Sequence, residues 1–271
     1  MSSMMISLAV GAAAVLVIMS SLWLLGIRHR NFSYVDIGWC VNFAVLAAIG
    51  AALGDGSPTR KWIIAGMYTI WSLRLAWHLA DRIIGEPEEG RYVELRRTWG
   101  TSGNLNWKFF LFFQLQAALN LILVVPLLLA SRNSSAEWHP LEIAGILLWV
   151  AAVCGESLAD RQLASFKRDP ANKGEVCNVG LWRYSRHPNY FFEWMIWVAY
   201  ALFALPSPYG WIALAMPALM LHFLINVTGV RATEEQAVRS KGEKYRRYQR
   251  ETSMFVPLPP KPSRERPAAT H

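Results

Sequence analysis

The stretch MMISLAVGAAAVLVIMSSLWLLGIRHR, residues 4–30, decides the class of fold. From residue 4 to residue 26 it is apolar or small, and a helix of about 20 such residues crosses roughly 30 Å of hydrocarbon. No basic residue precedes the run, and it ends in GIRHR instead of the small residues of a cleavage site. It therefore predicts a retained membrane span and not a secretory signal.

Further apolar runs of similar length follow along the chain. Among 271 residues, 54% are hydrophobic, 13 are Trp and only 17% are charged, which is too apolar for a soluble domain of this size. The expected spans are residues 4–26, 35–54, 61–80, 109–130, 141–160, 190–206 and 209–229. The sequence thus predicts an all-α, polytopic integral membrane protein with about seven transmembrane helices.

The basic residues predict how these spans are oriented. Lys and Arg gather in the connections after the first, third and fifth expected spans and in the C-terminal tail, whereas the other connections hold only Arg60, Lys61 and Arg132. Loops rich in Lys and Arg stay in the cytoplasm, so we expect the N-terminus outside and the C-terminus in the cytoplasm. In a bacterium this membrane would be the inner one. The net charge of +8 is thereby explained without a nucleic-acid partner.

Several segments are expected to extend beyond the bilayer. The fifth span continues through the polar stretch 156–169, and the inner loop 82–108 contains a short helix. Residues 231–250 predict a cytoplasmic amphipathic helix. We expect one membrane domain over residues 1–258 and a Pro-rich, disordered tail over residues 259–271.

One carboxylate, Asp36, lies at the inner entrance of the second expected span. A charge in a span costs a few kcal/mol, so an ionisable residue there is a candidate for function. The alternatives are hydration at the interface and a structural pair with Arg28 or Arg30.

The third expected span carries a polar stripe in WSLRLAWHLADR, residues 71–82. Arg74, His78 and Arg82 recur at steps of four residues, with Asp81 beside them, so we expect them on one inward face. Such donors suit a phosphate-bearing ligand. An ion pair with a carboxylate of the fifth span is the alternative.

The fifth expected span supplies carboxylates at its inner end. Glu156 and Asp160 are one helical turn apart, and Lys167 follows on the emerging helix. No further ligand at suitable spacing accompanies them, and the three Cys show no CxxC, so no metal site is expected. Hydrogen bonds to ribose hydroxyls or an adenine amine suit these carboxylates better.

The stretch RYSRHPNYFFEWM, residues 183–195, places polar groups at the start of the sixth expected span. Asn189 and Glu193 fall on one helical face, while Arg186 and His187 stand at its mouth. The tail adds Arg231, Tyr245 and Tyr248 on the same side of the membrane. Cations, amides and aromatic rings from separate segments predict a bound nucleotide cofactor.

Two long stretches, GLWRYSRHPNYFFE (180–193) and EEQAVRSKGEKYRRYQRETSMFVP (234–257), resemble the C-terminal half of the steroid 5-alpha-reductase family. SYVDIGWC, WSLRLAWH and RYVELRRTWG resemble its bacterial branch, so the resemblance covers about residues 30–258. Members are seven-helix membrane enzymes that bind NADPH from the cytoplasmic side. They reduce a conjugated carbon-carbon double bond of a lipophilic enone, such as a 3-oxo-4-ene steroid, and the resemblance implies the same activity here.

The resemblance also implies roles for single residues. Asn189 and Glu193 match the family's Asn-x-x-x-Glu, which holds the nicotinamide end, and Asp160 matches an acid that contacts the adenosine part. Asp36 stands near the family's carbonyl-polarising Glu, with Tyr68 as a looser partner. The expected catalytic residues are Asp36 and Tyr68. The expected cofactor-binding residues are Arg74, His78, Arg82, Arg91, Glu156, Asp160, Lys167, Tyr184, Arg186, His187, Asn189, Tyr190, Glu193, Arg231, Tyr245 and Tyr248.

Some positions depart from that family. Val35 stands where the steroid enzymes have Gln, Trp71 stands where they have the third-span Tyr, and Glu175 replaces a phosphate-binding Arg. The first two departures concern the substrate end of the expected site.

The chemistry of an enone explains why a carboxyl group is expected near its oxygen. Hydride addition to the β carbon develops negative charge on the carbonyl oxygen, and a hydrogen-bond donor there lowers the barrier. A carboxyl in an apolar cavity tends to remain protonated, so Asp36 is expected to be this donor. The expected substrate is a lipophilic molecule that enters from the membrane lipids.

Two other functions fit parts of the sequence. RHPNY and the C-terminal stretch also resemble membrane methyltransferases of the isoprenylcysteine type, which use S-adenosylmethionine. Phe192 stands where those enzymes usually have Gly, which favours the reductase. The second alternative is a non-enzymatic lipid-binding or transport protein whose basic face attracts anionic headgroups.

Overall fold

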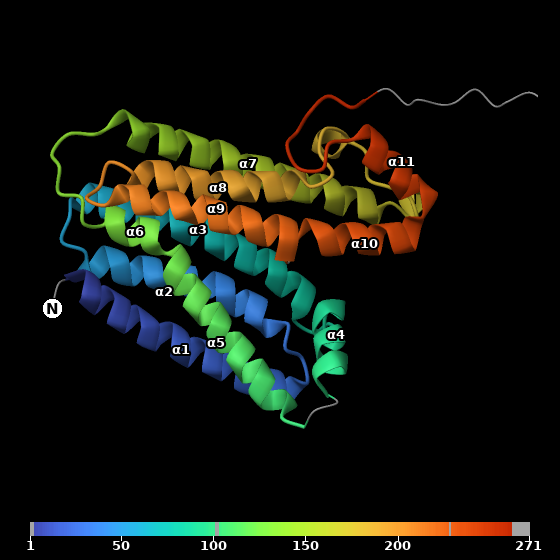
Figure 1. The fold of residues 1–271 in the computed structure, drawn as a ribbon, viewed down its shortest axis with the longest axis horizontal. Helices are drawn as coiled ribbons and strands as arrows, with labels where there is room; N and C mark the ends of the chain where they lie inside the picture. The colour runs from blue at the N-terminus through green and yellow to red at the C-terminus, as the bar shows by residue number, and fades with distance from the viewer. Residues whose placement is uncertain (1–2, 101–102, 228, 262–271) are drawn as a thin grey trace, which may run out of the picture. The chain divides into compact units, whose positions relative to one another are not determined.

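The computed structural model describes residues 3–100, 103–227 and 229–261. Every regular element in these ranges is helical, and the one extended pairing there is an isolated bridge between Ser185 and Ser253. The expectation of an all-α protein is therefore confirmed. The α-helices are α1 (Ser3–His29), α2 (Tyr34–Leu53), α3 (Pro58–Ile83), α4 (Gly90–Trp99), α5 (Leu105–Leu123), α6 (Val125–Ala130), α7 (Pro140–Arg168), α8 (Pro188–Ala204), α9 (Ala215–His222), α10 (Val230–Lys241) and α11 (Glu243–Glu251) (Figure 1).

In the described residues, four shorter helices also occur. These are the 3-10 helices η2 (Pro170–Asn172), η3 (Gly180–Arg183) and η4 (Gly210–Leu214), and the π-helix η5 (Phe223–Val227).

Five helical segments of the described residues are long and apolar enough to cross a membrane. They are Ser3–His29, Tyr34–Leu53, Leu105–Ala130, Pro140–Arg168 and Gly210–Val227. The other two expected spans correspond to α3, which carries several charged side chains, and to α8, which is 17 residues long. A multi-pass membrane protein is thus supported, while the number seven and the orientation stay predictions.

The chain divides into two compact units. Unit 1 comprises Met1–Ile143 and Tyr200–Met216, and unit 2 comprises Ala144–Ala199 and Pro217–His271. The expected single domain over residues 1–258 stays a prediction.

Unit 1 is a helical bundle with an aromatic core. Helix α2 packs against α1 and α3, and α5 packs against α1 (Figure 1). The rings of Tyr68 and Tyr200 stack with centroids 3.9 Å apart, and Phe43 and Trp71 pack beside them, all fully buried. Such rings contribute both buried area and a specific geometry, which together fix the register of α2 and α3.

A buried ion pair fastens the start of α3 to the start of α7 in unit 1. The Nε of Arg60 lies 2.5 Å from Oε1 of Glu142, and the two side chains are 2% and 1% exposed. Arg60 also donates to the carbonyl oxygens of Ser135 and Glu137 and lies over the Trp138 ring. The buried guanidinium of Arg60 and the buried carboxylate of Glu142 therefore each have a partner of opposite charge.

Removing either member of this pair should destabilise unit 1. We expect Arg60→Met to lower the free energy of unfolding by about 3–5 kcal/mol, because it leaves Glu142 as an uncompensated buried charge. Thermal unfolding of the protein in detergent measures the loss. The control is Arg132→Met, which removes an exposed pair with Asp55 at 3.8 Å and should cost at most about 1 kcal/mol. Equal losses for the two variants would contradict this assignment.

Unit 2 packs α8 closely against α7. A Cβ placed on Gly155 of α7 would lie 2.5 Å from the Phe192 ring of α8, so only glycine fits there. The indole of Trp182 donates to the carbonyl of Ala159 at 2.9 Å and ties η3 to α7. The polar ends of α7 and α8 are consequently held side by side.

The C-terminal region forms two helices where one was expected over residues 231–250. Gly242 separates α10 from α11 with φ of 56° and ψ of −128°, a conformation that favours glycine. The expectation of one continuous helix is therefore corrected. Of the tail expected to be disordered, residues 262–271 lie outside the described ranges, while the backbone N–H of Lys261 donates to Glu251.

Candidate functional site

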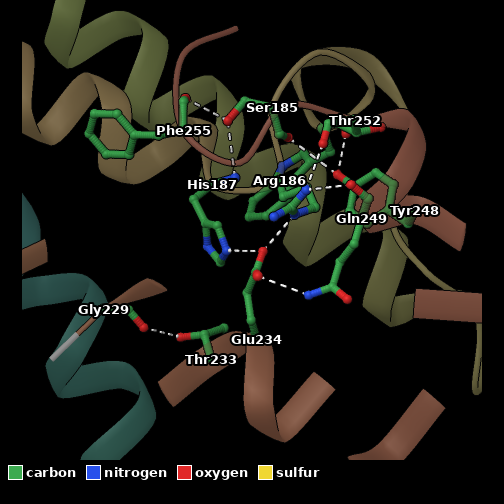
Figure 2. Close-up of polar contacts among 11 residues, drawn as sticks. Ser185, Arg186, His187, Gly229, Thr233, Glu234, Tyr248, Gln249, Thr252 and Phe255 are labelled. Carbon is green, nitrogen blue, oxygen red and sulfur yellow. Dashed lines mark hydrogen bonds and ion pairs between the residues drawn. The ribbon is translucent and has the colours of Figure 1, made fainter. Parts of the chain in front are cut away.

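The loop before α8 is joined to the two C-terminal helices by Arg186 (Figure 2). Its Nε donates to Oε1 of Glu234 on α10 at 2.5 Å. Its Nη1 donates to the carbonyl oxygens of Gln249 and Thr252 at 2.9 and 2.7 Å. The side chain is 9% exposed. One guanidinium thus connects three segments that are far apart in the sequence.

The neighbours of Arg186 extend this network (Figure 2). Ser185 donates through Oγ to the carbonyl of Phe255 at 2.7 Å, and its Oγ accepts from the backbone N–H of His187. The Tyr248 hydroxyl donates to the carbonyl oxygens of Trp182 and Ser185. The ends of the loop and of α11 are therefore fixed by both side chains and backbone.

Glu234 is the anion of this network. Burial alone would raise the pKa of Glu234, but hydrogen bonds from His187 and Arg186, the charge of Arg186 and a hydrogen bond from Gln249 lower that pKa to about 2. The Nε2 of His187 lies 3.3 Å from Oε1 of Glu234. The carboxylate consequently stays ionised over the whole physiological pH range.

These contacts bear on four residues expected to bind the cofactor. Arg186, His187, Tyr245 and Tyr248 are all buried, and the polar groups of Arg186 and Tyr248 are engaged within unit 2. Burial raises the pKa of both tyrosines, so their hydroxyls stay protonated. In the structure these side chains position the loop and the tail, whereas the Tyr184 ring is exposed.

The facing polar groups of α7 and α8 form the second feature of unit 2. Glu156 and Glu193 are 4% and 8% exposed. The Nδ2 of Asn189 lies 3.4 Å from Oδ1 of Asp160, and Glu193 accepts from the indole of Trp197 at 3.0 Å. Asp160 on α7 thus lies beside Asn189 on α8, and Glu193 lies one helical turn after Asn189.

Asn189 leaves one strong acceptor unused. Its Oδ1 is buried and has no hydrogen-bond partner among the described residues. An unsatisfied buried carbonyl costs about 1–3 kcal/mol and needs an explanation. A ligand that presents an N–H donor, such as a carboxamide, fits this position.

Basic groups lie near the end of α7 in the same unit. Burial lowers the pKa of Lys241, and the positive charge of Lys167 lowers it further, so the two ammonium groups repel. Lys241 donates to the carbonyl of Glu175 at 2.6 Å. Such a pair favours a bound anion. Sequence analysis singled out Lys167 but missed Lys241, which directly precedes the helix break at Gly242.

An open cleft of ≈590 Å³ lies along α10. The expected residue Arg231 lines it, together with Arg239, Glu235 and the apolar side chains of Val238 and Met254. Arg231 pairs loosely with Glu235 at 3.8 Å and is 76% exposed. The cleft therefore combines both signs of charge with an apolar floor.

In unit 1, Asp36 has a specific partner. Arg91 donates to both carboxylate oxygens of Asp36 at 2.5 and 2.7 Å, and the Tyr92 hydroxyl donates to Oδ1 at 2.8 Å. Both bonds from Arg91 come from one nitrogen, Nη2, which joins Arg91 and Asp36 in an ion pair. The protonated Asp36 that the enone chemistry calls for stays a prediction. Arg28 and Arg30, the partners considered earlier, make no ion pair with Asp36 in the described residues.

Tyr92 was missed by sequence analysis, although it adjoins Arg91 in RYVELRRTWG. Its ring is fully buried, and both burial and the charge of Asp36 raise the pKa of Tyr92, so the hydroxyl remains a proton donor. The hydroxyl of the expected Tyr68 donates instead to the carbonyl of Leu123 at 3.1 Å.

The expected polar stripe of α3 is only partly inward. Arg74 is half-buried, whereas His78 and Arg82 are exposed, and Arg82 pairs with Glu89 at 2.7 Å. Helix α3 therefore does not turn all three side chains inward, contrary to the expectation of one inward-facing stripe.

Comparison with known proteins gives a family. A family model described as "Protein of unknown function (DUF1295)" matches residues 22–252. The chain belongs to the DUF1295 family. The matched range includes both Asp36 and the whole Arg186 network.

Two curated proteins of the fission yeast Schizosaccharomyces pombe (strain 972) are similar to this DUF1295 chain. "Uncharacterized protein C594.04c" is 26% identical over 268 residues, which cover 87% of this chain and 75% of the yeast protein. "Uncharacterized protein C9.08c" is 28% identical over 196 residues, which cover 63% of each chain. No solved structure matches.

The DUF1295 chain should depend on Arg186 for the stability of unit 2. Arg186→Met removes the donors for two buried carbonyls and for Glu234, so we expect a loss of about 3 kcal/mol in the free energy of unfolding. Chemical denaturation in detergent, followed by circular dichroism, measures the loss. The matched control is the exposed Arg183 in the same loop, where Arg183→Met should change stability by less than about 0.5 kcal/mol.

Glu234 should make stability depend on acid pH. Because its pKa is lowered from the usual 4.5 to about 2 on folding, its stabilisation is complete above pH 4.5 and is lost as the pH falls toward 2. We therefore expect the melting temperature of the wild-type protein to fall across this window, and that of Glu234→Gln to fall less. Glu235→Gln, an exposed neighbour, should follow the wild-type curve. Parallel curves for wild type and Glu234→Gln would contradict this role.

Proposed function

We propose that the chain is a membrane-embedded, NADPH-dependent reductase that transfers hydride to the conjugated double bond of a lipophilic enone, such as a 3-oxo-4-ene steroid. The observation that carries the proposal is the unused acceptor of Asn189 beside Asp160 and the buried Glu193. These residue types and this spacing also carry the resemblance to the steroid 5-alpha-reductases.

The described residues of unit 2 fit a dinucleotide. Asn189 offers Oδ1 to the amino group of a nicotinamide carboxamide, and Glu193 adds a second acceptor on the same face. Asp160 and Glu156 offer acceptors for ribose hydroxyls or an adenine amine. When bound, the nicotinamide would supply hydride. The residues of this chain would orient it and exclude water from it.

The phosphates of such a cofactor need cations. Lys167 and Lys241 repel one another in unit 2, and a phosphate would relieve this repulsion. NADPH carries one more phosphate than NADH, and we propose it as the cofactor on the resemblance to the steroid 5-alpha-reductases. The role expected of Arg186 stays a prediction, and its Nε and Nη1 already donate to Glu234 and to two carbonyls.

The catalytic role expected of Asp36 in unit 1 stays a prediction. Asp36 accepts from Arg91 and from the hydroxyl of Tyr92. A tyrosine hydroxyl carries one proton, so Tyr92 as it stands has none left to donate to a substrate carbonyl.

Cofactor binding tests this proposal directly. The protein purified in detergent should bind NADPH, as measured by the fluorescence of the reduced nicotinamide. Asn189→Ala and Glu193→Gln should each weaken binding by about tenfold or more, because the first removes a buried acceptor and the second removes the charge and replaces one acceptor oxygen by an NH2 donor. The control is Glu243→Gln, an exposed carboxylate of α11 that should bind as the wild type does. Absence of NADPH binding would refute the function, and unchanged binding by both variants would refute the site.

The methyltransferase alternative is favoured by RHPNY, residues 186–190, and is tested by the same assay. Binding of S-adenosylmethionine in place of NADPH by the wild-type protein would support it. The structure gives Phe192 a packing role against Gly155, and this bulky ring occupies the place where those enzymes usually have Gly.

A further inference from the structure

A small cleft of ≈340 Å³ in unit 1 lies at the end of α1. The residues that line it are Gly26, Ile27, Arg30, Phe32, Arg96 and Asn106. No acidic side chain is among them, in contrast to the cleft along α10, which two glutamates line. The cleft is therefore positive.

Arg30 supplies a charge that no other side chain uses. It forms no ion pair with a described residue, and it is exposed, with φ of 54°. This left-handed conformation is rare for a residue other than glycine, and such strain is concentrated at functional positions. Arg96 is held against the cleft by Glu88 at 2.9 Å and by the ring of Phe32 beneath its guanidinium. Arg30 is thus the available cation.

The surroundings of the cleft are those of a membrane interface. Helix α1 is long and apolar enough to span, and only 17% of its most apolar window is buried. Leu24 and Leu25, just before the cleft, are exposed apolar side chains. The indole of Trp23 donates to the carbonyl of Asn106 at 2.9 Å, and the exposed Trp107 stacks on Phe110. Trp side chains concentrate where membranes meet water.

We propose that this cleft binds the phosphate headgroup of an anionic phospholipid, with Arg30 as its ligand. The positive charge selects the phosphate, and the exposed leucines of α1 receive an acyl chain. A soluble phosphate lacks that chain and gains nothing from these leucines. The site belongs to unit 1 and is independent of the proposed reductase activity.

Native mass spectrometry of the delipidated protein in detergent tests the proposal. Phosphatidylglycerol should bind with higher occupancy than phosphatidylcholine of the same chains, and inorganic phosphate in large excess should not displace it. Arg30→Asn removes the charge with a residue that tolerates the left-handed conformation, and it should weaken phosphatidylglycerol binding about fivefold. The control is Arg28→Asn, which removes an equal charge two residues away, outside the lining.

Each result decides the proposal. A loss specific to Arg30→Asn supports a defined headgroup site, whereas equal losses for both variants show diffuse attraction and overturn it. Displacement by inorganic phosphate overturns the lipid as ligand. If Arg30→Asn fails to fold, as judged by circular dichroism, the comparison of the two lipids with wild-type protein still decides: equal binding refutes the site.

Discussion

The buried guanidinium of Arg186 is the interaction on which the polar end of unit 2 depends. It donates to a carboxylate on α10 and to carbonyls at the end of α11, so it orders the loop before α8 and both C-terminal helices together. Asn189 and Glu193 lie only three and seven residues after Arg186, on α8, which follows this loop. The start of α8, which carries the proposed nicotinamide site, is therefore held by a structural contact within unit 2.

Much of this protein could be predicted from its sequence, because apolar run length and helical periodicity are local properties. They predicted α1, the long polar extension of α7, the short helix α4 and the shared face of Asn189 and Glu193 on α8. What local patterns do not contain is the choice of partner. Asp36 pairs with Arg91 and Tyr92, which are 55 and 56 residues away, and not with the nearer Arg28 or Arg30. The helix break at Gly242 is a second example, because glycine allows the backbone angles found there but does not require them.

Polar residues that hold the helices of a membrane protein together and polar residues that bind its ligands look alike in a sequence. Arg60 and Arg186 are fully engaged within their own units, whereas Asn189 and Arg30 each retain bonding capacity. Whether the hydrogen-bonding groups of a side chain already have partners therefore separates structural residues from candidate site residues. Residue type and depth in the membrane do not. This criterion favours a polar acceptor site in unit 2 and a cationic one in unit 1.

The acceptors of Arg186 also have a consequence for synthesis. Two of them are backbone carbonyls at positions 249 and 252, and Ser185 is bound by the carbonyl at 255. A ribosome must therefore finish nearly the whole chain before the loop at 185–187 can bury its charge. Until then Arg186, at the head of α8, lacks the carbonyls that accept from it in the folded unit.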